Sequence, residues 1–368
     1  MRSLHYRRAR SANQILLPER LESRTLLSAW TIADDYQLAA GQIASGHSMA
    51  SDSAGNVYAI GSAHDSSNRS HGIVREKLAG STTWSTIEDY PAASVSGTSF
   101  YAVAVDSAGD LYVGGQTHDS LNKPQWLVLE KLAGGSAFTV VDNYATSVGG
   151  IGVEGLAIDG AGNVFAAGQS ATIGKGNKAT YYWTVRKRTG GVGAFTTVDN
   201  SISGTGNDNP YSATYIADGA AAGLYVVGTG TGSQWLVRKS IDAGVTWTTV
   251  DSFFYNSTNA TALSVTGDGR GDVYVVGKGG VLNSGGVVHW LVRESINGGT
   301  SWSTVDNFGL GGTLSSAGSV GADLAGNIYV AGSASEASGT SHGIIRSNAG
   351  GSWTTVDVTG RTGDYNGF

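Results

Sequence analysis

Hydrophobic and polar positions alternate along most of the chain in short runs, and four such runs recur in a fixed order. In the second copy they cover Phe100–Val105, Leu111–Gly115, Trp126–Lys131 and Phe138–Tyr144. A period of two is typical of β-strands, and the Gly-rich stretches between the runs are typical of tight turns. No segment of this region shows a convincing helical period of 3.6 residues. The pattern therefore predicts repeating units of four short strands, named a to d.

An aromatic residue begins each predicted strand d and marks the period of the repeat. These residues are Trp30, Trp84, Phe138, Phe195, Trp247, Trp302 and Trp353. Their successive spacings are 54, 54, 57, 52, 55 and 51 residues. Four-stranded units at a period of about 50 residues, none able to bury both faces alone, predict an all-β fold, a β-propeller of four-stranded antiparallel blades.

The number of blades depends on how the extra copy of strand d is used. Six units contain all four strands, and a further strand-d pattern, WTIADDY at Trp30–Tyr36, precedes them. This extra strand either adds to the edge of the sixth blade or belongs to a seventh blade that lacks its other strands. We favour six blades, with seven, one of them incomplete, as the alternative.

Composition agrees with this fold class and narrows the function. The chain has 56 Gly among 368 residues, 4 Pro and 14% charged residues, which favours strands and tight turns over helices. A formal net charge of −6 argues against nucleic-acid binding. The absence of cysteine excludes disulfides, thiolate metal sites and a cysteine nucleophile. The sequence contains no apolar run of about 18 residues, so it predicts no membrane-spanning helix. Nothing in it points to a cofactor.

The N-terminal segment differs from the repeats, since residues 1–29 are rich in arginine and contain no glycine. They have no continuous apolar region, so an ordinary secretory signal fits poorly. The stretch LESRTLL resembles the LEPR-XLL segment of large surface or exported bacterial proteins, with Ser23 where that pattern has proline. The resemblance implies an exported, extracellular or cell-surface bacterial protein. The alternative is a leader that carries no targeting signal. We expect a disordered leader at 1–29, the propeller at 30–358 and a C-terminal tail at 359–368.

Two turn signals within the units resemble known repeat families. Between strands a and b, the pattern D-x-x-G-N-x-Y-x-x-G is similar to propeller repeats of the SBBP and NHL type. Between strands c and d, SIDAGVTW resembles the Asp box of the bacterial neuraminidase repeat, S-x-D-x-G-x-T-W. The matching residues are Ser240, Asp242, Gly244, Thr246 and Trp247, and in the next unit Ser295, Asn297, Gly299, Ser301 and Trp302. Because turn chemistry explains each of these positions, we interpret both boxes as structural.

The Asp-box resemblance implies a sialidase-like fold, in which these turns lie on the face opposite the active site. Sialidase activity itself is not expected, because the family's Phe/Tyr-Arg-Ile-Pro motif is absent. Five arginines instead form one column on strand c, and all nine tryptophans fall into two columns. Residues repeated around a ring suit a scaffold better than a single asymmetric site. The arginines of the column are Arg75, Arg186, Arg238, Arg293 and Arg346.

The loops between strands b and c of the first two units carry the same irregular motif, HDSSN and HDSLN. Imidazole and carboxylate groups bind metals and polar ligands, and loops often carry sites. The candidate ligand-binding residues are His64, Asp65, Asn68, His118, Asp119 and Asn122. The alternative is that Asp, Ser and Asn simply build a turn. The sequence leaves the metal open and assigns no catalytic residue.

Three functions fit these observations. We favour a non-catalytic, exported propeller whose loop face binds a protein or a glycan. The second is a glycan-active enzyme, a hydrolase or lyase, which would need paired carboxylates about 5–10 Å apart. Its candidate acids are Asp65, Asp119, Glu154 and Glu336. The third is a structural spacer within a larger surface assembly, and the sequence leaves the oligomeric state open.

Overall fold

The computed structural model describes residues 32–359 except residues 92, 95, 146–150, 177, 203–208 and 282–285. The chain from Tyr36 onward forms one compact unit, separate from the residues before it. Its regular structure is β-strand apart from two short 3-10 turns, η1 (Thr189–Gly191) and η2 (Gly219–Ala221). Within the described ranges, no helix has the length and hydrophobicity that a membrane crossing requires. The predicted leader and nearly all of the predicted tail lie outside the described residues.

Each blade is a four-stranded antiparallel unit whose neighbouring strands are consecutive in sequence. Blade 1 contains β1 (Ala44–Ser51), β2 (Val57–His64), β3 (Ser70–Lys77) and β4 (Ser85–Pro91). Blade 2 contains β5 (Ser99–Val105), β6 (Leu111–His118), β7 (Pro124–Lys131) and β8 (Thr139–Asp142). Blade 3 contains β9 (Ile151–Ile158), β10 (Val164–Ile173), β11 (Ala179–Arg188) and β12 (Thr196–Ile202).

The last three blades repeat this plan. Blade 4 contains β13 (Asn209–Ile216), β14 (Gly223–Gly230), β15 (Gln234–Ser240) and β16 (Thr248–Phe253). Blade 5 contains β17 (Ala260–Gly267), β18 (Val273–Gly280), β19 (Val288–Ser295) and β20 (Ser303–Phe308). Blade 6 contains β21 (Gly311–Ala322), β22 (Ile328–Glu336), β23 (Ser341–Ser347) and β24 (Thr354–Thr359). A single parallel bridge, Val288 to Leu314, joins blades 5 and 6 into an eight-stranded sheet. The predicted propeller of six four-stranded blades is confirmed.

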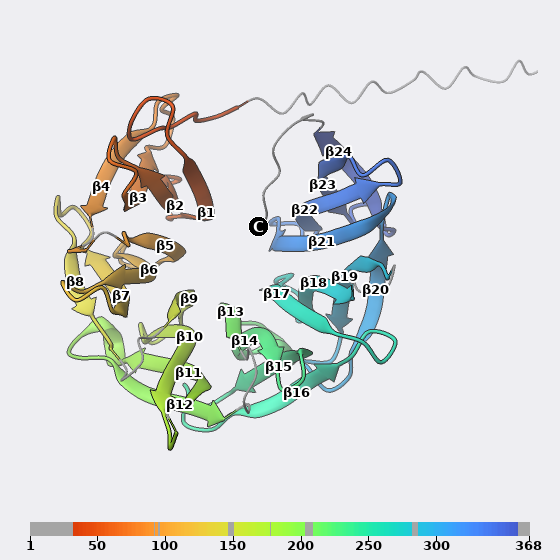
Figure 1. Cartoon of the computed structure of the whole chain (residues 1–368). Coiled ribbons are helices and arrows are strands. Elements are labelled where there is room, and N and C mark those ends of the chain that lie inside the picture. Colours follow the sequence, from red (N-terminus) through yellow and green to blue (C-terminus); the bar gives the residue numbers. More distant parts are fainter. Residues whose placement is uncertain are drawn as a thin grey trace, which may run out of the picture. The chain divides into compact units, whose positions relative to one another are not determined.

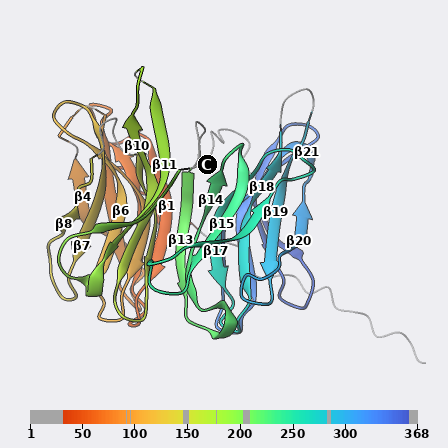
Figure 2. The same cartoon turned by 90° about the horizontal axis from the view of Figure 1, so that it is seen from below.

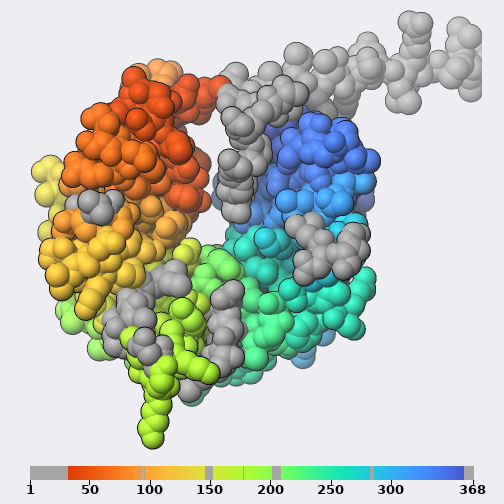
Figure 3. Space-filling view, in the orientation of Figure 1, coloured from red at the N-terminus to blue at the C-terminus, as the bar shows by residue number. Residues whose placement is uncertain are grey.

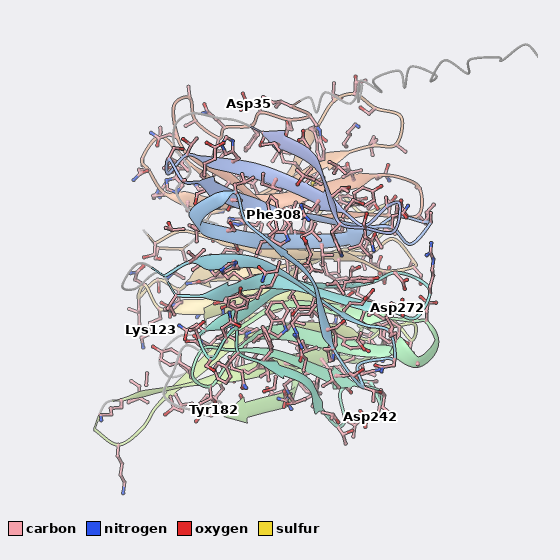
Figure 4. All side chains as sticks on the ribbon, turned by 90° about the vertical axis from the view of Figure 1, so that its right-hand side faces the viewer. Asp35, Lys123, Tyr182, Asp242, Asp272 and Phe308 are labelled. Atoms are coloured by element: carbon pink, nitrogen blue, oxygen red, sulfur yellow. The ribbon has the colours of Figure 1, made fainter. Side chains whose placement is uncertain are left out.

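The blades follow one another in sequence order around a central opening, with the first strand of each blade innermost (Figure 1). The space-filling view shows the same order (Figure 3), and from the side the strands run in the direction of the propeller axis (Figure 2). Lys123, in a loop between strands b and c, lies at the opposite end of the blades from Asp242 and Asp272 (Figure 4). We therefore distinguish a loop face, formed by the b–c loops, from a turn face, formed by the a–b and c–d turns.

The hydrophobic core consists of five clusters, each between two successive blades. Between blades 2 and 3, for example, Trp126 and Val128 pack with Val153 and Phe195. The tryptophans that begin strand c are the largest side chains with no more than 1% exposure: Trp126, Trp183, Trp235 and Trp290. Inter-blade packing, predicted for this tryptophan column, is confirmed, and no blade has a core of its own.

A buried ion pair ties strand d of one blade to strand c of the next. Arg186 donates two hydrogen bonds to Asp142, at 2.7 and 2.9 Å. Arg293 does the same to Asp251, at 2.7 and 3.0 Å. Further pairs of this kind are Arg238–Asp199 and Arg346–Asp306. The arginine column is therefore part of the scaffold and holds successive blades in register.

Blade 2 departs from this pattern because Leu129 occupies the arginine position of its strand c. The acid at the corresponding place on β4 is Glu88, whose pKa is raised by burial and by the neighbouring charge of Asp89. The contact between blades 1 and 2 therefore depends on apolar packing rather than on an ion pair.

The extra strand predicted at Trp30–Tyr36 is not observed. Trp30 and Thr31 lie outside the described residues, and residues 32–36 form no strand, so for this part the prediction is wrong. The physical reason is pairing: every observed strand d is hydrogen-bonded to the strand c that precedes it in its own blade. Residues 32–36 join no described sheet, and a segment outside a hydrogen-bonded ladder is not a strand.

Removing one partner of a buried ion pair tests its role in the scaffold. Because Asp251→Ala leaves the guanidinium of Arg293 buried and unpaired, we expect a loss of roughly 3–5 kcal/mol in the free energy of unfolding. The double variant Asp251→Leu, Arg293→Met should regain most of this loss, since no buried charge is left alone. Urea unfolding followed by circular dichroism measures both. An Asp251→Ala protein as stable as the parent would contradict the assignment.

Candidate functional site

Each inner strand contains a β-bulge at the same place, which leaves one residue at that place out of the ladder. The unpaired residues are His47, Tyr101, Glu154, Tyr211, Leu263 and Gly318. A bulge redirects its extra residue without ending the strand. Since the inner strands line the central opening (Figure 1), we call these six positions the wall residues.

A glycine on strand b makes each bulge possible. A β-carbon on Gly115 would lie 2.1 Å from the carbonyl oxygen of Ser99 on the inner strand, which no other residue type allows. The same conflict, at 1.9–2.2 Å, exists at Gly61, Gly168, Gly228, Gly277 and Gly332. Each of these residues is the glycine of the Y-x-x-G pattern in its unit. The repeat therefore contains a signal for the bulge, although the spacing alone does not identify the displaced residue.

Three successive wall residues form a titratable group. The rings of His47 and Tyr101 meet edge to face, with centroids 5.2 Å apart. Burial raises the pKa of Glu154 to about 7 and lowers the pKa of His47. Burial also raises the pKa of Tyr101; a hydrogen bond with Ser99 opposes this shift, and the charge of Glu154 adds to it.

The side chains of His47, Tyr101 and Glu154 can take part in proton transfer. The pKa of Glu154, about 7, lies near neutral pH, while the shifts favour the uncharged imidazole of His47 and the protonated phenol of Tyr101. A carboxyl group with a pKa near the working pH is suited to general acid–base catalysis. The same three groups can equally hydrogen-bond a polar ligand.

A cleft of about 280 Å³ opens on the loop face beside the fourth wall residue, Tyr211. Its lining comes from blades 4, 5 and 6 and combines an aromatic ring with hydroxyl and amide groups. The lining residues that offer polar side chains are Tyr211, Thr229, Ser233, Asn259, Thr261 and Lys278. Lys278 is its only charged side chain and makes no ion pair with any described residue. The cleft was not foreseen from the sequence.

The first predicted loop is held by its own side chains. Asp65 accepts hydrogen bonds from the backbone amides of Ser67 and Arg69, at 2.8 and 2.9 Å, and from the Arg69 guanidinium. His64 Nδ1 lies 2.9 Å from Asn68 Oδ1, and Asn68 adopts a left-handed backbone with φ 59°. These are the contacts of a turn closed by aspartate.

The second predicted loop is built in the same way. Asp119 accepts hydrogen bonds from two backbone amides of its own loop, both at 2.9 Å. His118 Nδ1 donates to the carbonyl oxygen of Gly97 at 3.0 Å. Asn122, with φ 62°, accepts a bond from Ser94 at 2.9 Å. Ligand binding by these residues stays a prediction.

The predicted residues lie close together within each loop, but those of one loop do not contact those of the other. Among the described residues, no group of three or more His, Cys, Asp or Glu side chains is arranged to hold a metal ion. Of the four acids proposed for catalysis, Asp65 and Asp119 close turns, and Glu336 lies on the surface, 3.1 Å from His342 Nε2. Glu154 is partly buried, and desolvation raises its pKa to about 7.

The Asp-box residues form a closed network on the turn face. Asp242 accepts hydrogen bonds from the hydroxyl of Ser240 and from the backbone amide and hydroxyl of Thr246, at 2.6–2.9 Å. Gly244 donates to the Ser240 hydroxyl at 2.8 Å, and the Trp247 indole donates to the Gly244 carbonyl at 3.2 Å.

The second box repeats the network with amide and hydroxyl groups. Asn297 accepts from the Ser301 backbone amide at 2.9 Å, and Gly299 donates to the Ser295 hydroxyl at 2.8 Å. The Trp302 indole donates to the Gly299 carbonyl at 3.3 Å. In both boxes the polar groups are used within the turn.

Comparison with known proteins supports the fold and leaves the function open. No protein-family model and no curated protein sequence matches the chain. A protein of unknown function from Dyadobacter fermentans has a similar structure, with TM-score 0.51 and 11% identity over 84% of this chain and 96% of that one. The periplasmic gluconolactonase of Pseudomonas aeruginosa has TM-score 0.50 and 12% identity over 83% of this chain and 82% of that one.

A Hadza microbial sialidase is also similar, with TM-score 0.49 and 12% identity over 78% of this chain. This chain spans 62% of the length of that sialidase. At such low identities, structural similarity shows the propeller fold alone.

The ionisation of Glu154 predicts a pH dependence of stability. Below pH 4 the carboxyl is protonated in both states; between its ordinary pKa and about 7, only the unfolded chain ionises fully. Stability should therefore fall as pH rises through this window, by roughly 3 kcal/mol at about 1.4 kcal/mol per pKa unit. Glu154→Gln should lack this part of the loss. Urea unfolding of both proteins at pH 4, 6 and 8 measures it; parallel curves would contradict the buried state of Glu154.

Proposed function

We propose that this protein is a non-catalytic propeller that binds an acidic glycan through the cleft on its loop face. The observation that carries the proposal is the lining of that cleft: one aromatic ring, several neutral hydrogen-bonding groups and one lysine without a charged partner among the described residues. Sugar recognition needs hydroxyl and amide groups for the sugar hydroxyls and an aromatic face for the ring.

Lys278 supports a ligand that carries a negative charge. An ammonium group that lines a cleft and has no carboxylate beside it attracts uronate or sulfate groups. The volume of about 280 Å³ is near the lower end of ligand pockets, about 300–1,000 Å³, so we expect it to hold a terminal sugar or a short stretch of chain. A polypeptide ligand is the alternative occupant.

Export and repeat type belong to the same proposal. The resemblance of LESRTLL to the LEPR-XLL segment supports an exported or surface-attached bacterial protein, and the turn patterns support SBBP- or NHL-type repeats with Asp boxes. A surface location would give the loop face access to extracellular glycans.

Substitution of two cleft residues tests the binding proposal. Against uronate-containing and sulfated oligosaccharides, Lys278→Ala should weaken the Kd about tenfold, because one charge-assisted hydrogen bond is lost. Tyr211→Ala should weaken binding of acidic and neutral oligosaccharides alike. The matched control is Lys131→Ala, at the turn-face end of β7, which should leave the Kd unchanged. Isothermal titration calorimetry measures all three.

Two results would contradict the proposal. One is equal affinity of the parent and Lys278→Ala for every acidic oligosaccharide that binds. The other is the absence of binding to any glycan, together with binding of a polypeptide at the same cleft.

A second candidate function, a glycan-active enzyme, is favoured by the titratable group at His47, Tyr101 and Glu154. We expect no turnover when the parent is incubated with a panel of glycans. If products do form, Glu154→Gln should abolish them, because the amide cannot exchange a proton at neutral pH. Asp119→Ala is the control, since its side chain closes a turn. Turnover that depends on Glu154 would replace the binding proposal with the enzyme.

A further inference from the structure

The outward face of blade 6 lacks the cover that every other blade has. The aromatic residue that begins each Y-x-x-G pattern on strand b packs on the following blade. Five of these residues are at most 5% exposed: Tyr58, Tyr112, Phe165, Tyr225 and Tyr274. The sixth, Tyr329 of β22, is 40% exposed. Ala331, two positions along the same face, is exposed as well. Since alternate strand residues point to opposite faces, the part of this face that β22 forms with Tyr329 and Ala331 is exposed.

Blade 1 is open on the opposite side of its sheet. Val57 and Ala59 of β2 are partly exposed, whereas their counterparts in the other five blades are at most 1% exposed. Met49, on the inner strand β1, is 63% exposed. The five apolar clusters join blades 1 to 2 and onward to 6, and none of those formed by described residues joins blade 6 to blade 1.

The ion-pair column identifies what blade 6 could accept. Asp142, Asp199, Asp251 and Asp306 each accept hydrogen bonds from an arginine on strand c of the next blade. Asp357 holds the equivalent position on β24 and is only partly buried. It has no ion-pair partner among the described residues, so this end of the column offers a carboxylate to an incoming arginine.

Blade 1 presents the complementary half of the same interface. The guanidinium of Arg75 lies over the ring of Tyr36, 4.5 Å from its centroid. Stacks of the same kind hold Arg186 on Tyr144 at 4.1 Å, and they recur between Arg293 and Phe253 and between Arg346 and Phe308. In those stacks the aromatic residue lies at the end of strand d of the preceding blade or just after it. Tyr36 takes this place beside blade 1, although no described blade precedes it.

We propose that the surface between blades 6 and 1 is a docking site for one more unit of this repeat type, a three-stranded a–b–c element with an arginine on strand c. The arginine pairs with Asp357, and the apolar face of the element covers Tyr329 and Ala331. Its other face covers Val57 and Ala59 of blade 1. Strand d is not required from the partner, because Tyr36 already provides the aromatic residue that stacks on Arg75.

The full chain carrying an extra copy of residues 311–347 at its C-terminus tests this proposal. The copy supplies strands a, b and c of blade 6. We expect its docking to raise the Tm and to slow hydrogen exchange of the β22 amides about tenfold or more, because the exposed sheet face at β22 becomes covered. Peptides from β14 should exchange as before, because that strand is already buried.

Two variants separate specific docking from a general effect of the extension. Replacing the copied arginine of the extension (from Arg346) with leucine, the residue of blade 2, should remove most of the gain. Asp357→Ala in the host should do the same, and the two changes together should cost little more than either one.

Three outcomes would overturn the proposal. In the first, the extension stays unfolded on intact blades, with unchanged Tm and unchanged exchange of β22. In the second, the leucine form protects β22 as well as the arginine form does. In the third, the unextended chain sediments as a dimer that already protects β22, so that a second copy of the chain occupies the surface.

Discussion

The contact of one blade with the next is the interaction on which this molecule depends. A four-stranded sheet has two faces and cannot bury both by itself, so each apolar cluster of the structure belongs to two blades. The paired arginine and aspartate residues add register to this packing, because a buried guanidinium is tolerated only where a carboxylate meets it. The same rule explains why the faces at the two ends of the series are exposed and why they are complementary.

Some positions of the repeat build the scaffold, and the bulged position of each inner strand varies from blade to blade. The strand-b glycine permits a bulge in every inner strand, and the bulged residue takes no part in the ladder or in the inter-blade columns. This position is therefore free to differ, and across the six blades it holds histidine, tyrosine, glutamate, tyrosine, leucine and glycine. Glu154, with its pKa raised to about 7, and Tyr211, which lines the cleft, both lie at such positions.

Much of the fold could be predicted from the sequence because its determinants are local. Turn residues, the aromatic at strand d and the tryptophan at strand c repeat in the chain itself, and they indicate four-stranded units and their number. The extra strand predicted at Trp30–Tyr36 is wrong for residues 32–36, because the pattern shows a residue's strand tendency and not whether the residue joins a sheet. The loop motifs HDSSN and HDSLN stood out as irregular, yet their side chains are engaged in their own turns. Glu154 was among the candidate acids, but its raised pKa depends on burial by neighbouring blades, and the cleft at Tyr211 and Lys278 is assembled from three blades far apart in sequence.

We propose that ligand binding takes place on the loop face, at the positions that the repeat leaves free. A crystal structure of the chain soaked with a uronic-acid trisaccharide tests it most directly. We expect a sugar ring beside Tyr211 with its carboxylate at the ammonium group of Lys278, and no sugar at the Asp boxes. A trisaccharide bound on the turn face, with the cleft empty at a concentration that saturates binding in solution, would contradict it.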